Sequence, residues 1–322
     1  MKIVIPGGSG QVGSILDRAF RADGHDVVIL SRHPNRSNRS GQRRIGWDAR
    51  TLGPWVDEID GADVVINLAG YTVNCRYNRK NRNRIMSSRV DSTRVVGEAI
   101  RTASRPPTVW LQASTATIYA HTFDVSNIEA SGIIGGKEAN VPDTWKFSID
   151  VARAWERVLD DADVPNTRKV KMRSAMVMSP DRGGIFDVLL GLVRKGLGGR
   201  SGDGRQYVSW IHHVDFVRAV YWLIDHGDVE GAVNLCSPNP MDNARFMQAI
   251  RRAWGTKLGL PATEWMLAVG ALFMRTETEL ILKSRKVVPG RLTNNGFKFL
   301  HPDWPAAVED LVKAFRQKSN CS

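Results

Sequence analysis

The stretch VIPGGSGQVGSIL, residues 4–16, decides how the first half of the chain is interpreted. A short apolar run leads directly into Gly7, Gly10 and Gly13, and helical spacing follows. Glycines at this spacing allow a tight turn and let backbone N–H groups approach a pyrophosphate, while the helix N-terminus adds partial positive charge. Gly8, Gly10 and Gly13 fit the same pattern. The stretch therefore predicts dinucleotide binding, with a purely structural glycine turn as the alternative.

Apolar runs alternate with helical patterns through the first 180 residues. The runs are nearly continuous in Val, Ile and Leu, which is typical of strands buried on both faces of a parallel sheet. Between the first two runs, apolar residues recur at helical spacing over 12–20. Strands that alternate with helices indicate an α/β fold with a doubly wound parallel sheet. The expected strands are residues 2–6, 26–31, 43–47, 62–70, 108–115 and 169–178.

The pattern changes after residue 180, where a smaller and mostly helical lobe is expected. Asp215 stands where the N-cap of one of its helices is expected. We therefore predict a nucleotide-binding domain over residues 1–180 and a smaller lobe over 181–322 that packs on it, with some residues exchanged between them. Helical or strand-like runs in this half span residues 185–199, 205–213, 215–227 and 231–237.

The chain is basic, with 45 Lys and Arg against 33 Asp and Glu. Its densest run, RYNRKNRNR at 76–84, is interpreted as the solvated face of a basic helix, with attraction of cofactor phosphates and nucleic-acid binding as alternatives. Aromatic interleaving is limited to Tyr77, so no nucleic-acid partner is expected. Expected partners are a small-molecule substrate and a second copy of the chain in a homodimer.

Apolar runs in the chain fall short of the roughly 20 residues that span a bilayer, and the N-terminus lacks a signal-peptide pattern. We therefore expect a cytoplasmic protein without membrane contact. The three cysteines are odd in number, widely spaced and without a CxxC pair, which argues against disulfides and against a metal site.

The second expected strand ends in Ser31 and Arg32. An NAD-selective site would carry Asp or Glu here, about 20 residues after the glycines, to bind the ribose 2′-hydroxyl. A guanidinium instead fits a 2′-phosphate, which a carboxylate would repel. The sequence therefore favours NADP(H) over NAD(H), with an exposed loop arginine as the alternative.

Further motifs lie along nearly the whole chain: GGSGQVG, SRHP, VINLAG, SSRVDSTRVV, GLGGRSGDGRQYVSWIHHVD, NLCSPNP and VVPGRLTNNGFKFLHPDWPAAVEDL. With them the chain resembles the short-chain dehydrogenase/reductases in their extended, nucleotide-sugar-epimerase-like branch. More narrowly, it resembles the atypical epimerase family proteins that carry a distinctive C-terminal domain. The resemblance implies a Rossmann-type NADP-binding domain whose cleft is covered by a C-terminal lobe.

The resemblance also implies a set of cofactor-binding residues. Those expected at the pyrophosphate are Gly7, Ser9, Gly10, Gln11, Val12 and Gly13. The others are Ser31 and Arg32 at the 2′-phosphate, Leu68, Ala69 and Gly70 beside the adenosine, Arg84 and Arg89 on the following helix, and Val177 near the nicotinamide at the end of the sixth strand.

Active enzymes of this superfamily use a Ser or Thr together with a Tyr and a Lys four residues later on one helical face. Ser114 and Thr115 are the hydroxyl candidates, with strand-end hydrogen bonding to the backbone as the alternative. The Tyr–Lys pair is missing, because the helix in KFSIDVARAWERV, 146–158, offers Phe147 and Val151, or Ser148 and Ala152 one residue on. An apolar stripe of Phe147, Val151, Ala154, Trp155 and Val158 predicts core packing instead.

The candidate substitutes for the missing acid are few. His212 has an unperturbed pKa near 6.5 and is the preferred candidate, with a structural histidine as the alternative. Lys146 is expected to face solvent. We therefore interpret the chain as an NADP(H)-binding oxidoreductase or epimerase of a small molecule, with a catalytically silent NADP(H)-binding regulator or sensor as the alternative.

Overall fold

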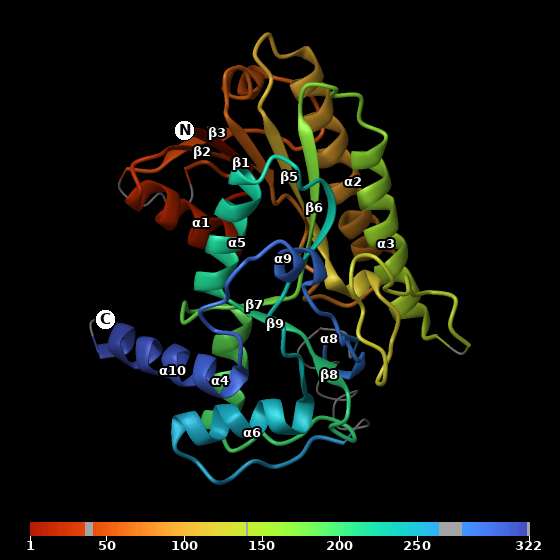
Figure 1. Ribbon diagram of the computed structural model, residues 1–322, viewed down its shortest axis with the longest axis vertical. Helices are drawn as coiled ribbons and strands as arrows, with labels where there is room; N and C mark the ends of the chain where they lie inside the picture. Colours follow the sequence, from red (N-terminus) through yellow and green to blue (C-terminus); the bar gives the residue numbers. More distant parts are fainter. Residues whose placement is uncertain (36–40, 140, 264–278, 321–322) are drawn as a thin grey trace.

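The computed structural model describes residues 1–35, 41–139, 141–263 and 279–320 (Figure 1). Its centre is a seven-stranded sheet of order β10-β6-β5-β4-β1-β2-β3, in which every neighbouring pair is parallel. The predicted doubly wound α/β fold is confirmed. The strands are β1 (Lys2–Pro6), β2 (Asp26–Ser31), β3 (Arg43–Gly46), β4 (Val64–Asn67), β5 (Val109–Thr115), β6 (Arg168–Ser174) and β10 (Gly231–Leu235).

Helices cover both faces of this sheet (Figure 1). Alternate side chains of a strand point to opposite faces, so Ile3 and Ile5 pack into one core and Val4 into the other. Burying each of these aliphatic side chains contributes about 1.5–3 kcal/mol. Helices α1 (Gln11–Ala22) and α5 (His213–Asp225) cover the first face, and α2 (Arg79–Thr102) and α3 (Asp143–Asp160) cover the second.

The second half of the chain builds a separate core below the sheet (Figure 1). Trp304 stacks on Phe246 with ring centroids 4.1 Å apart, and Trp210 lies 4.8 Å from Trp304. Strand β10 joins the large sheet although it comes from this half of the chain. The remaining elements are α4 (Ile185–Arg194), β8 (Tyr207–Val208), β9 (Trp210–His212), β11 (Met241–Asp242), α6 (Asn243–Trp254), α8 (Glu279–Leu282), α9 (Gly290–Asn294) and α10 (Trp304–Asn320). None of the described helices combines the length and hydrophobicity that crossing a bilayer requires.

The run predicted as one strand over 169–178 is two strands. Strand β6 ends at Ser174, and β7 (Met176–Met178) leaves the sheet to pair with β9. The strand breaks at Ala175 because the chain changes its hydrogen-bond partner there. The Ala175 N–H still donates to the Leu235 carbonyl of β10, whereas the next residues turn toward the lower core. Val177 is therefore not at the end of the sixth strand but pairs with Ile211 in the small sheet.

Asp215 is not the N-cap of helix α5, contrary to the prediction. The helix begins two residues earlier, and His212 caps it by accepting the Val214 N–H through Nδ1 at 3.3 Å. The fully buried Asp215 carboxylate accepts the backbone N–H groups of Leu300 and His301 at 2.8 and 2.7 Å. An aspartate near the start of a helix is the usual sequence signal for an N-cap, but the Asp215 side chain is bound instead by the backbone of residues 300 and 301.

Candidate functional site

The glycine loop joins β1 to α1. It lies at the carboxyl end of β1, beside β4, where the order of the strands along the chain reverses; this is the switch point of the sheet. Gly7 has φ +74°, and a Cβ there would lie 2.6 Å from backbone atoms of Ala69. A Cβ on Gly13 would lie 2.3 Å from the carbonyl oxygen of Gly8, so this glycine allows the helix to pack against the loop. Gly10 caps the helix and has only one atom, at 4.0 Å, near the place of a Cβ. The loop is thus closed on its protein side and open beside Gly10.

A cavity of about 780 Å³ lies over this loop. It extends from the helix N-terminus across the ends of β1, β2 and β4. Nine of the predicted cofactor residues line it: Gly7, Ser9, Gly10, Ser31, Arg32, Leu68, Ala69, Gly70 and Arg84. The sequence reasoning missed the remaining lining residues, which are Leu30, His33, Trp47, Asp48, Ala49, Arg50, Tyr71, Ser87 and Ser88. A cavity with a helix N-terminus at one end and arginines at its rim fits an elongated anion such as a dinucleotide.

Asp48, just beyond β3, is among the residues that line the cavity. Its carboxylate accepts the N–H groups of Arg50 and Thr51 at 2.8 and 2.9 Å and the Thr51 hydroxyl at 2.7 Å. These hydrogen bonds, led by the Thr51 backbone, hold the pKa of Asp48 below its ordinary value. The loop is therefore held in shape by an ionised side chain. Asp48 directly follows the third expected strand, and this position was the sequence feature that could have pointed to it as a site residue.

Two of the predicted arginines have different positions. Arg84 is exposed, lines the cavity and lies over the Tyr71 ring, 5.7 Å from its centroid. Arg89 instead donates to the carbonyls of Tyr71 and Ile85 at 3.1 and 3.0 Å and lies over Trp155 at 5.0 Å. Burial lowers the pKa of Arg89 to about 10. Arg89 holds the loop after β4 in place and is not among the residues lining the cavity.

The other four predicted cofactor residues, Gln11, Val12, Gly13 and Val177, also lie outside the cavity lining. Val12 packs against the sheet core, and Val177 is buried in the same core. Gln11 points its side-chain amide toward Gly184, and its Nε2 is a buried donor without a hydrogen-bond partner among the described residues. The closed cradle around Gly7 at the helix N-terminus, in contrast, borders the cavity and fits a bound pyrophosphate.

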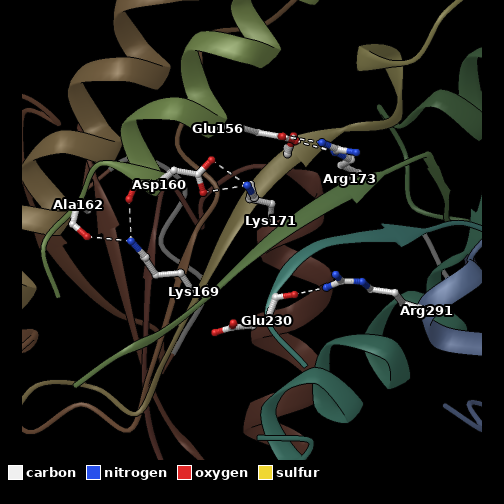
Figure 2. A network of polar contacts seen from close by, with 9 residues as sticks. Glu156, Asp160, Ala162, Lys169, Lys171, Arg173, Glu230 and Arg291 are labelled. Carbon is white, nitrogen blue, oxygen red and sulfur yellow. Dashed lines mark hydrogen bonds and ion pairs between the residues drawn. The ribbon is translucent and has the colours of Figure 1, made fainter. Parts of the chain in front are cut away.

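Ser114 lies at the end of β5, as predicted, but its hydroxyl is engaged. Its Oγ donates to Oε1 of Glu156 at 2.6 Å. Figure 2 shows Glu156 of α3 facing Arg173 of β6, which donates through Nε at 2.8 Å and through Nη2 at 2.7 Å. Burial alone would lower the pKa of Arg173, but hydrogen bonds and charge from Glu156 raise it. The neighbouring Thr115 accepts the Thr117 N–H and caps a short 3-10 helix, Ala116–Ile118.

His212 lies in the lower core, away from the glycine loop's cavity. It is fully buried, its ring lies against the His301 ring with centroids 3.8 Å apart and a tilt of 31°, and its Nε2 is 3.3 Å from a carboxylate oxygen of Asp310. Because Nδ1 accepts the Val214 N–H, Nε2 carries the ring proton and has no lone pair for a metal ion. Burial, with His213 and His301 nearby, lowers the pKa of His212 to about 2. These contacts are those of a neutral structural histidine.

Helix α3 presents two different faces around the missing Tyr–Lys pair. Phe147 and Val151 pack with Tyr77 just before α2, and the ring centroids of Phe147 and Tyr77 lie 5.3 Å apart. Of the predicted stripe, Val151 and Trp155 are buried, whereas Phe147, Ala154 and Val158 are half-buried. The face toward the sheet carries Ile149, Ala152, Glu156 and Leu159. Lys146 is exposed, as predicted.

A polar cluster that the sequence reasoning missed borders this second face. Ser148 donates to Oε2 of Glu279 at 2.5 Å, and Ser148 also hydrogen-bonds the Tyr77 phenol. Nζ of Lys283 lies 4.0 Å from Oε1 of Glu279 and donates to the Thr117 carbonyl at 2.8 Å. Glu279 and Lys283 are almost completely buried. The sequence carries no local signal for this cluster, since Ser148 and Glu279 are 131 positions apart.

Comparison with known families agrees with this architecture. Residues 3–136 match the model of the NAD dependent epimerase/dehydratase family, and residues 262–311 match a domain of unknown function, DUF1731. An epimerase family protein of Staphylococcus epidermidis is 30% identical over 315 residues, which cover 97% of this chain and 99% of that protein. The human epimerase family protein SDR39U1 is 28% identical over 317 residues, covering 97% of this chain and 100% of the human one.

Solved structures show the same relationship. The crystal structure of human SDR39U1 (isoform 2) with NADPH matches with a TM-score of 0.82 at 28% identity, covering 97% of this chain and 99% of that one. A nucleoside-diphosphate sugar epimerase of Corynebacterium glutamicum matches with a TM-score of 0.72 at 26% identity, covering 99% of this chain and 66% of the other. With the glycine loop, the parallel sheet and the C-terminal domain in place, the chain belongs to the epimerase family proteins, which are extended short-chain dehydrogenase/reductases.

Proposed function

We propose that this protein is an NADP(H)-dependent oxidoreductase or epimerase that acts on a small molecule without the usual Tyr-x-x-x-Lys pair. One observation carries the cofactor part: the cavity over the glycine loop has Ser31 and Arg32 at the end of β2, where an NAD-selective site would have a carboxylate. The predicted cofactor agrees with the NADPH held by the human relative.

Each part of the cavity would hold one part of the cofactor. The N–H groups beside Gly10 would bind the pyrophosphate, because they are donors at a helix N-terminus. Ser31 and the exposed Arg32 would bind the 2′-phosphate, and the segment 68–70 would border the adenosine. When bound, NADP(H) supplies or accepts the hydride of the reaction.

The second candidate function is a catalytically silent NADP(H)-binding regulator or sensor. A specific observation favours it: the hydroxyl of Ser114 is engaged by Glu156, which is itself bound on both oxygens by Arg173. A hydroxyl used in this way does not polarise a substrate carbonyl. In this reading the cofactor cavity is retained for binding alone.

Cofactor selectivity tests the proposal directly. NADPH at 100 times its dissociation constant should stabilise the fold by about 2.7 kcal/mol, which a thermal-shift measurement detects. Arg32→Asp should abolish the preference for NADPH over NADH, because the carboxylate repels the 2′-phosphate and can bind a 2′-hydroxyl. Arg252→Asp, at an exposed position on α6, is the matched control and should keep the preference. Equal shifts by NADH and NADPH in the unaltered protein would contradict the assignment to Arg32.

Turnover separates the two candidate functions. The unaltered protein is incubated with NADPH and a panel of carbonyl compounds and nucleotide sugars, and the absorbance of NADPH is followed. Consumption of NADPH that depends on the added compound supports an oxidoreductase. NADPH binding without turnover on a broad panel favours the regulator.

A further inference from the structure

Ser148 lies on the face of α3 that is directed toward the carboxyl ends of the sheet strands. It is one helical turn before Ala152, which packs with Ala116 and Ile118 just beyond β5. Phe147 and Val151, in contrast, face the start of α2. Ligand groups of doubly wound sheets gather at the carboxyl ends of the strands. Ser148 is therefore the side chain near the start of α3 that points toward the place where substrate chemistry is expected.

The hydroxyl of Ser148 joins two other proton-carrying groups. It donates to the Glu279 carboxylate at 2.5 Å and is also a hydrogen-bond partner of the Tyr77 phenol. Burial, followed by the charge of Glu279, raises the pKa of Tyr77 to about 12, so the phenol keeps its proton. Tyr77, Ser148 and Glu279 thus form one polar cluster in which Ser148 donates to the carboxylate.

Cations from the C-terminal domain surround Glu279. Lys283 places Nζ 4.0 Å from its Oε1, and the charge of Glu279 also acts on the buried guanidinium of Arg285. Burial lowers the pKa of Lys283 to about 8, and Glu279 partly opposes this shift. Lys283 also donates to the Thr117 carbonyl, two residues beyond β5. The charged groups are therefore held at the carboxyl end of the sheet and not on the outer surface.

We propose that Ser148 and Glu279 form the proton-transfer pair of this protein, taking the place of the missing Tyr–Lys pair. This inference rests on the proposed function. In the oxidation direction, the O–H bond of a substrate alcohol breaks and its proton moves to Oγ of Ser148, while Ser148 passes its own proton to Oε2 of Glu279. The electron pair of the adjacent C–H bond leaves as hydride to the oxidised nicotinamide dinucleotide, so the alcohol becomes a carbonyl. Lys283 and Arg285 are positioning residues that balance the charge of Glu279.

Cofactor affinity tests this placement without any substrate. The oxidised nicotinamide ring carries a positive charge that the reduced ring lacks, so a neighbouring carboxylate stabilises NADP⁺ more than NADPH. Dissociation constants for both forms are measured by calorimetry for the unaltered protein, Glu279→Gln and the exposed control Glu309→Gln. Glu279→Gln should weaken NADP⁺ relative to NADPH by about tenfold, the size expected of charges several ångströms apart at intermediate dielectric. Glu309→Gln should leave the ratio of the two constants unchanged.

The outcomes of this measurement are distinct. An unchanged NADP⁺ to NADPH ratio in Glu279→Gln, with both forms bound, overturns the inference and leaves the proposed function standing. An unaltered protein that binds neither form overturns the proposed function, and this inference with it. Glu279→Asp keeps a carboxylate at this position, so its ratio of NADP⁺ to NADPH dissociation constants should be close to that of the unaltered protein. This variant therefore separates a charge effect from local misfolding.

Turnover provides the second readout with any substrate that the panel identifies. Ser148→Ala should lower kcat by roughly 10²–10⁴ with little change in KM, because the hydroxyl acts in the proton transfer and not in binding. Ser148→Thr keeps a hydroxyl and should recover a substantial part of kcat. Equal loss in both variants, or a kcat untouched by Ser148→Ala, would overturn the role of Ser148.

Discussion

The hydroxyl of Ser114 donates a hydrogen bond to Glu156 at 2.6 Å, and Arg173 holds the same carboxylate through two nitrogens. The strand-end serine expected to act on substrate is thereby part of an ion-pair network between β5, β6 and α3. Arg173 extends the network to the Tyr119 hydroxyl at 2.9 Å, which in turn donates to Asn234 of β10 at 2.9 Å. The hydrogen bonds cross three neighbouring strands of the sheet.

Glu156→Gln should destabilise the fold by about 3–5 kcal/mol, because it leaves the Arg173 charge buried without its counter-charge. The free energy of unfolding is measured by urea denaturation. Asp160→Asn is the matched control: Asp160 pairs with Lys171 between the same helix and strand, but its side chain is 55% exposed (Figure 2). Its loss should cost about 0–1 kcal/mol. Similar costs for the two variants would contradict a structural role for the Glu156–Arg173 pair.

Two glycines of the phosphate loop should respond differently to alanine. Gly13→Ala places a methyl group 2.3 Å from the Gly8 carbonyl oxygen and should cost at least about 1–3 kcal/mol of stability, because backbone has to move. Gly10→Ala has room and an ordinary φ of −78°, so the fold should lose less than about 1 kcal/mol. Its methyl group nevertheless enters the cavity and should weaken NADPH binding. Urea denaturation without cofactor and calorimetry with NADPH separate the two effects; a stable Gly13→Ala variant would disprove the close packing.

Stability should fall as the pH is lowered from about 6.5 toward 4. Burial lowers the pKa of His213 to about 4 and that of His212 to about 2, so both stay neutral in the folded protein while the unfolded chain takes up protons. The unfolded state then binds more protons, and the free energy of unfolding decreases with decreasing pH, by up to about 1.4 kcal/mol per pH unit for each histidine. Asp181, Lys318, Arg18 and Asp310 are the charged groups acting on His213.

His212→Asn tests the contribution of one histidine. Asparagine can accept the Val214 N–H as an N-cap but does not titrate, so the slope of stability against pH should decrease although the variant is less stable overall. Denaturation midpoints at pH 4.5, 5.5 and 7 give the slope. A slope identical to that of the unaltered protein would show that His212 does not titrate differently on unfolding.

Much of the fold could be predicted because its signals are local. The Val-, Ile- and Leu-rich runs and the glycines after the first run predict a parallel sheet with a dinucleotide site, and strand β2 was predicted to the residue, Asp26–Ser31. The split of 169–178 and the capping of α5 were predicted wrongly. In both cases the deciding partner is distant in sequence: Leu235 for the residue after β6, and Leu300 and His301 for Asp215.

The sequence by itself predicted the cofactor cradle, because the glycines after the first strand and the absence of a carboxylate directly after β2 can be read from the residues themselves. It also showed that the Tyr–Lys pair is missing. Only the tertiary structure decided what stands in that place: Ser114 engaged by Glu156, His212 buried in the lower core, and Ser148 facing Glu279. Proton-carrying groups act through contacts of about 3 Å between side chains, and residues far apart in sequence make such contacts only once the sheet, α3 and the C-terminal domain have packed together.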